Sequence, residues 1–78
     1  MAIDKAQKDN LKALGACLKR IRLKKKLTLK ELGYIIDKDA QSISRVEMGD
    51  VNPTYLYLLR ICEGLEIDIK DLFTNDKI

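Results

Sequence analysis

The stretch LTLKELGYIIDKDAQSISRVEMG, residues 27–49, decides the fold of this chain. Thr28 is followed three residues later by Glu31, which is the spacing of a capping box at the start of a helix. Apolar residues then recur at helical spacing until the Asp-Lys-Asp run at 37–39 interrupts them. The residues after this run form a second helical pattern that ends at Gly49, a residue type that commonly stops a helix. The stretch therefore predicts two short helices joined by a tight turn.

Three further helices are predicted around this unit, so that the expected fold class is all-α. The first starts with a cap at Asp9 or Asn10, with room for an extra turn before it, and carries apolar residues at helical spacing. That apolar stripe is Leu11, Leu14, Leu18 and Ile21. The second and third short helices are expected from Leu29 for about eight residues and from Ala40 to about Met48. A fourth is expected from Thr54 to about Gly64, and a short fifth from a cap at Asp68 to near Phe73.

Length and composition limit the classes of protein that fit. The 78 residues are expected to form one domain, 1–78, with a core over about 9–73 and a tail at 74–78. The sequence has no apolar run near the length of a membrane span and no signal-peptide pattern, which favours a cytoplasmic protein. It contains no His, and its two cysteines, Cys17 and Cys62, have no metal-ligand spacing. We therefore expect no metal or cofactor and interpret both cysteines as free thiols in the core.

Basic residues are concentrated in one segment of the chain. There are 15 Lys and Arg against 12 Asp and Glu, which gives a net charge of +3. Seven of the basic residues and no acidic residue lie between positions 19 and 30, whereas acidic residues collect from Glu63 onward. A solvated helix face gives the same pattern, but such segregation is also typical of a surface that meets nucleic acid.

The helix that begins at Ala40 exposes side chains suited to base edges. Ile43 and Val46 lie three residues apart and mark its inner face. Gln can pair in two places with adenine and Arg with guanine, while Ser contacts either a base edge or a phosphate. The predicted base-contacting residues are Ala40, Gln41, Ser42, Ser44 and Arg45. We therefore predict that this helix enters the major groove of double-stranded DNA.

Most of the chain resembles one known family. The runs LTLKEL (27–32), ISRVEMG (43–49) and NPT (52–54), with the ending LEIDIKDLF (65–73), resemble the phage-repressor helix-turn-helix family, the XRE or Cro/cI-like proteins. The likeness covers residues 14–73. It implies a five-helix, lambda-repressor-like DNA-binding domain that binds operator DNA, commonly as a homodimer, and hence a transcriptional regulator.

The resemblance also assigns roles to single positions. It implies that Gln41, Ser42 and Arg45 lie at base edges, and that Arg22 and Glu47 form a structural tie between the first helix and the end of the third. It implies DNA-backbone contacts at the start of the second helix and in the loop before the fourth. The residues in these places are Thr28, Leu29, Lys30, Asn52 and Thr54.

The sequence departs from the family pattern in three places, which together involve four residues. Gly33 stands where the family usually has Ala, and still lets two helices approach closely. Asp37 and Lys38 replace the usual Gly and apolar residue of the turn; Asp tolerates the left-handed conformation needed there, and Lys38 becomes a further candidate for phosphate contact. Asp39 replaces the usual Ser or Thr cap. Its negative charge would repel a nearby phosphate, or its carboxylate would accept a hydrogen bond from cytosine.

The predicted fourth helix is apolar on more than one side. One stripe is expected to face the core: Tyr55, Leu58, Leu59, Cys62 and Leu65. Further apolar residues fall outside that stripe, and a helix of this kind is buried on more than one face. In so small a domain a second chain is the expected cover. We predict a homodimer whose interface contains Leu56, Tyr57, Ile61, Ile67 and Ile69.

Several biological roles remain open at this stage. The resemblance is compatible with a phage-type repressor, a restriction-modification controller or an antitoxin that regulates its own operon. The alternative from another class is a protein-interaction module that keeps the fold and binds a partner through the fourth and fifth helices. An enzyme is not expected, because no nucleophile stands beside a base, and no small-molecule ligand is expected.

Overall fold

A computed structural model describes residues 4–73, which form four α-helices and a short 3₁₀ helix without any strand. The elements are α1 (Lys5–Lys24), α2 (Leu29–Ile36), α3 (Ala40–Glu47), α4 (Tyr55–Leu65) and η1 (Ile69–Phe73). The all-α prediction is confirmed, and the expected fifth helix is a 3₁₀ helix. The predicted tail, 74–78, lies outside the described residues.

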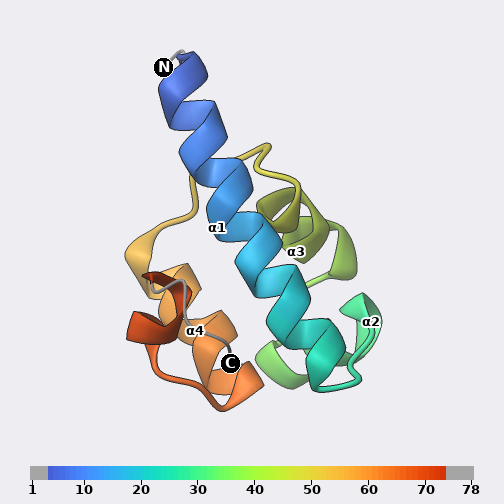
Figure 1. Cartoon of the computed structure of the whole chain (residues 1–78). Helices are drawn as coiled ribbons and strands as arrows, with labels where there is room; N and C mark the ends of the chain where they lie inside the picture. Colours follow the sequence, from blue (N-terminus) through green and yellow to red (C-terminus); the bar gives the residue numbers. More distant parts are fainter. Residues whose placement is uncertain (1–3, 74–78) are drawn as a thin grey trace.

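The first helix begins earlier than predicted. Asp4, and not Asp9 or Asn10, is its N-cap. Asp4 Oδ1 accepts from the Gln7 N–H at 2.8 Å, and Gln7 Oε1 accepts from the Asp4 N–H at 3.1 Å, which completes a capping box. This adds more than a turn to the helix, and Figure 1 shows its N-terminal end projecting past the other helices.

The helix-turn-helix unit follows the local signals of its sequence. Thr28 caps α2, and Thr28 Oγ1 accepts from the Glu31 N–H at 3.0 Å while Glu31 Oε1 accepts from the Thr28 N–H at 2.8 Å. Asp37 ends α2 in the left-handed region with φ 59° and ψ 48°, as the turn requires. Gly49 ends the next segment at φ +74°. Asp39 is the N-cap residue of α3 but makes no side-chain capping bond.

The core lies where the four helices meet. Helix α1 packs against α3, while α2 packs against both α3 and α4 (Figure 1). The most deeply buried side chains are Leu18, Ile21, Leu32, Ile43, Val46, Ile61 and Leu65. A Cβ at Gly15 would collide with the backbone carbonyls of Val46 and Glu47, so only glycine lets α1 approach the end of α3 this closely.

Helix α4 is rotated relative to the prediction. Its buried residues are Leu58, Ile61, Cys62 and Leu65. Tyr55, predicted to face the core, is 63% exposed, whereas Ile61 is 1% exposed. Helix α4 is contacted by both α2 and η1, so it buries side chains on two of its faces. Ile61 is one of these buried side chains.

Residues 4–73 contain neither a candidate membrane span nor a candidate metal site. None of the helices there has the length and apolar character needed to cross a membrane. Over the same residues, no three His, Cys, Asp or Glu side chains are grouped so that they could hold a metal ion.

Candidate nucleic-acid interface

Helix α3 presents one face to the core and the other to solvent. Ile43 and Val46 are buried at 1% and 2% exposure. Gln41 and Arg45 are exposed on the opposite face, and the small residues Ala40, Ser42 and Ser44 beside them are half-buried. The five predicted base-contacting residues therefore lie on one helix, with the two long polar side chains standing above three short ones.

A recess of about 370 Å³ lies beside this exposed face. Its lining residues come from α3, from the loop after it and from α4: Asp39, Gln41, Ser42, Arg45, Val51 and Tyr57. Because the two longest polar side chains of α3 border it, an edge of a base pair that approached α3 would meet this recess. Sequence reasoning missed Val51 and Tyr57 as parts of this surface, since neither lies on α3.

The base-contacting candidates differ in how free their polar groups are. The Ser42 hydroxyl lies 2.7 Å from the Tyr57 hydroxyl and shares a hydrogen bond with it. Ser44 Oγ donates to Met48 Sδ at 3.8 Å, a weak bond within α3. Neither Gln41 nor Arg45 makes a side-chain hydrogen bond within residues 4–73. These two side chains are therefore the ones most available to base edges.

A buried ion pair fixes the end of α3 to α1. Arg22 Nε donates to Glu47 Oε2 at 2.7 Å, and Arg22 Nη2 donates to Glu47 Oε1 at 3.0 Å. Arg22 Nη1 also donates to the Leu27 carbonyl at 2.8 Å, just before α2 begins. The side chains are 6% and 5% exposed. The tie predicted from the sequence is present, and it links α1, α3 and the start of α2.

A second tie to α1, which holds the start of the loop after α3, had no signal in the sequence. Lys8 Nζ, on the first turns of α1, donates to the Gly49 carbonyl at 2.6 Å and to Asp50 Oδ1 at 2.9 Å. This bond and the charge of Lys8 lower the pKa of the Asp50 carboxyl. The contact fixes the start of the loop that carries Asn52, and it joins residues more than 40 positions apart in the chain.

The predicted phosphate contacts lie on three separate elements. Leu29 and Lys30 occupy the first turn of α2, whose backbone N–H groups have no helical carbonyl to bind. Asn52 is exposed in the loop before α4, and Thr54 caps that helix by accepting from the Tyr57 N–H at 3.1 Å. Lys38 is exposed in the turn, with its ammonium 5.7 Å from the centre of the Tyr57 ring.

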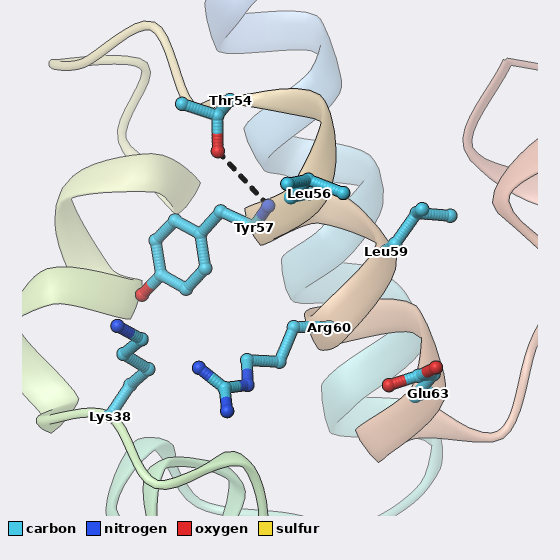
Figure 2. A pocket seen from close by; sticks show the side chains of 7 residues that line it. All are labelled: Lys38, Thr54, Leu56, Tyr57, Leu59, Arg60 and Glu63. Atoms are coloured by element: carbon cyan, nitrogen blue, oxygen red, sulfur yellow. Dashed lines mark hydrogen bonds between the residues drawn. The ribbon is translucent and has the colours of Figure 1, made fainter.

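A groove of about 440 Å³ runs between α4 and the turn (Figure 2). It is lined by Lys38, Thr54, Leu56, Tyr57, Leu59, Arg60 and Glu63. In Figure 2 the cationic side chains of Lys38 and Arg60 reach toward the space beneath the Tyr57 ring. Arg60 is a cation in the same groove as Lys38 and Thr54, two of the predicted phosphate contacts. Arg60 itself was not predicted from the sequence.

The predicted dimer surface needs correction. Ile61 is 1% exposed within its own chain, so the prediction that it lies in a dimer interface is wrong. Tyr57 is half-buried and turned toward α3. Leu56 is 74% exposed, and Ile67 and Ile69 are half-buried. Tyr55 and Phe73, at 63% and 66% exposure, are exposed apolar residues on the same elements.

The two cysteines have no role at this surface. Cys62 is buried in the core, and its burial, with the charges of Asp71 and Asp68, raises its pKa to about 11. Cys17 Sγ accepts from Arg20 Nη2 at 3.5 Å, and its side chain is half-buried against the core. Both are free thiols, as predicted, but only Cys62 is buried in the core.

Comparison with known proteins places this geometry in a family. The profile of the helix-turn-helix family matches residues 18–72. The restriction-modification controller protein C.AhdI from Aeromonas hydrophila superposes with a TM-score of 0.81 at 26% identity, covering 83% of this chain and 98% of that one. The clp gene regulator ClgR from Corynebacterium glutamicum superposes with a TM-score of 0.76 at 29% identity, covering 80% of this chain and 66% of that one. No curated protein sequence matches the chain closely enough to count as a relative.

The family profile spans most of the chain, and it includes α2, the turn, α3 and both partners of the buried ion pair. The solved structures that superpose on the chain are regulators by name. The chain therefore belongs to the XRE-type helix-turn-helix family.

Proposed function

We propose that this helix-turn-helix protein, a DNA-binding transcriptional regulator, acts in the cytoplasm as a homodimer on a palindromic operator. In this proposal α3 of each protomer enters the major groove, and the two half-sites lie about 34 Å apart, one turn of the DNA helix. Gln41 and Arg45 read base edges, while residues of α2 and of the loop before α4 contact phosphates.

The outward face of α3 carries this proposal. Its exposed polar residues, Gln41 and Arg45, are the types that make two-point contacts with adenine and guanine. The helix is held from behind by the Arg22–Glu47 ion pair and by the close approach of α1 at Gly15. A rigid helix with unpaired, two-pronged polar side chains is suited to reading sequence and not only to attracting phosphate.

The exposed apolar residues of α4 and η1 support the homodimer. Leu56, Tyr55 and Phe73 are each more than 60% exposed. Apolar side chains of this size on neighbouring elements favour a protein contact over solvent. A two-fold dimer would also double the DNA contact and give the operator its symmetry.

Selection of bound sites from a random duplex pool tests the DNA site. We expect an enriched palindrome whose half-sites are one helical turn apart. On that site, Arg45→Ala should cost about 1–3 kcal/mol and relax the preference at one base pair. Lys30→Ala is the matched control, because loss of a phosphate contact weakens binding equally on all sequences and lowers the salt slope by about one.

Two outcomes would count against the proposal. Equal losses on the selected site and on random DNA would show that Arg45 contacts phosphate only. Failure to bind any duplex at low salt would favour the protein-interaction module, which would use the same apolar surface of α4 and η1.

A further inference from the structure

Tyr57 connects α4 to the DNA-facing side of α3. Its hydroxyl lies 2.7 Å from Ser42 Oγ, and this contact joins two residues 15 positions apart. The hydroxyl is only partly buried. Figure 2 shows the ring leaving α4 and crossing the space toward α3, away from Leu56 and Leu59.

The surroundings of Tyr57 place it at the predicted base-reading surface. It lines the recess of about 370 Å³ together with Gln41, Ser42 and Arg45. On its other side it lines the groove that contains Lys38 and Arg60. Tyr57 therefore stands between the surface that would meet bases and the surface that would meet the DNA backbone.

The two hydroxyl groups form a single polar unit. They share one hydrogen bond, and whichever oxygen donates it, one hydroxyl proton remains for a third partner. The unit can therefore offer both a proton and lone pairs to a base edge in the recess. Because the Tyr57 ring is anchored in α4, the contact also holds the Ser42 side chain in one rotamer. A serine without this contact would lose side-chain conformational entropy when it bound a base.

The Tyr57 ring also orders a cation of the turn. The Lys38 ammonium lies 5.7 Å from the ring centre, within the range of a cation–π contact. This contact holds the Lys38 side chain, which is otherwise exposed, beside α4. One aromatic residue of α4 thus fixes a hydroxyl of α3 through its oxygen and a lysine of the turn through its face.

We propose that Tyr57 is a specificity-determining positioning residue, which acts through Ser42 to set the preferred base pair at that point of the half-site. The inference rests on the proposed DNA-binding function. It extends the base-reading group beyond α3 to a residue of α4.

The test is a double-mutant cycle on the operator selected by the wild-type protein. Tyr57→Phe keeps the ring and removes only the hydroxyl. Tyr34→Phe is the matched control, because it makes the same change at a side chain of α2 that is 90% exposed and belongs to neither proposed surface. Ser42→Ala identifies the base pair concerned, and affinity is then measured for all four base pairs at that position, with thermal unfolding recorded for every variant.

We expect Tyr57→Phe to reduce discrimination at that base pair by about 2- to 10-fold, the range of one neutral hydrogen bond. The other positions and the salt slope should be unchanged. In the Ser42→Ala background the same substitution should have no further effect on discrimination, and Tyr34→Phe should have none in either background.

The possible failures are distinguishable. If the wild-type protein shows no sequence preference at all, the proposed function fails and the inference falls with it. If the wild-type preference is present but Tyr57→Phe leaves it unchanged, only the inference is overturned. If Tyr57→Phe lowers stability and weakens binding equally on all duplexes, the contact is structural, and this result also overturns the inference.

Discussion

Arg22 donates three hydrogen bonds from a position that water scarcely reaches. Two go to the Glu47 carboxylate and the third to the Leu27 carbonyl. A planar guanidinium can satisfy a carboxylate in two places and still reach a third acceptor, whereas a lysine ammonium cannot reproduce this fork. The ion pair therefore fixes three elements at once, which accounts for the tolerance of two buried charges in so small a core.

Arg22→Met should destabilise the fold by about 3–5 kcal/mol, because it leaves Glu47 buried without its partner. Urea unfolding followed by circular dichroism measures this loss. The double variant Arg22→Met with Glu47→Leu should recover a large part of the stability, since both charges are then gone. A loss below about 1 kcal/mol for Arg22→Met would mean that the pair is solvated like a surface ion pair.

At the scale of elements, Gly33 sets how closely α2 approaches the turn that follows it. A Cβ at this position would collide with the Lys38 carbonyl, a backbone atom that cannot rotate away. Alanine is the better helix former by about 1 kcal/mol. The steric cost falls on the backbone of the turn, and an overpacked contact of this kind costs about 1–3 kcal/mol.

We therefore expect Gly33→Ala to lower the unfolding free energy, against its helix propensity. Ala16→Gly, on the exposed face of α1, is the matched control and should cost about 1 kcal/mol through propensity alone. Gly33→Ala and Ala16→Gly, although opposite in kind, should then both destabilise the protein. Thermal unfolding of the two variants measures this. A Gly33→Ala variant that is as stable as the wild type would indicate that the turn moves to admit the methyl group.

Helix boundaries were predictable from the sequence where local signals set them. The boundaries of α2 and α3 depend on signals within four residues, namely the Thr28–Glu31 box, the left-handed Asp37 and Gly49. The start of α1 was missed although its signal, Asp4 with Gln7 three residues on, is equally local. The sequence left room for an extra N-terminal turn, but the weak apolar pattern there did not identify Asp4 as the residue that caps it.

Apart from the Arg22–Glu47 tie, which the family resemblance implied, contacts between distant segments could not be predicted from the sequence. The Lys8–Asp50 and Ser42–Tyr57 contacts join residues whose proximity depends on how whole helices pack. The rotation of α4 was missed for a related reason. Nearly every turn of that helix offers an apolar residue on two sides, so the sequence alone allows more than one buried stripe, and packing against α2 and η1 selects the one with Ile61.

At the scale of the whole molecule, α1 holds in place α3 and the loop after it, two of the segments proposed to contact DNA. It contacts α3 at Gly15, holds the end of α3 through Arg22 and holds the loop after it through Lys8. Helix α4 packs against α2, and η1 packs against both α1 and α4. Most residues proposed to contact DNA lie on α2, α3 and the loops beside them, whereas the exposed apolar residues proposed to dimerise lie on α4 and η1. The two surfaces meet on α4, where Leu56 lies in one groove with Tyr57 and Arg60, so a substitution on η1 separates them best.

Phe73→Lys tests the dimer surface in these terms. Phe73 is 66% exposed on η1 and lies outside the groove beside the turn, so a lysine there should leave the fold intact while placing charge in the proposed interface. Sedimentation velocity at tens of micromolar should show a dimer for the wild type and a monomer for the variant. Affinity for the palindrome should fall because each half-site is then bound separately, whereas affinity for an isolated half-site should change little. Leu23→Lys, which places a lysine at a 55% exposed apolar residue of α1, should stay dimeric and bind the palindrome like the wild type. A wild-type protein that sediments as a monomer and binds the palindrome one chain at a time would contradict the dimer, and would leave the apolar surface of α4 and η1 to a different partner.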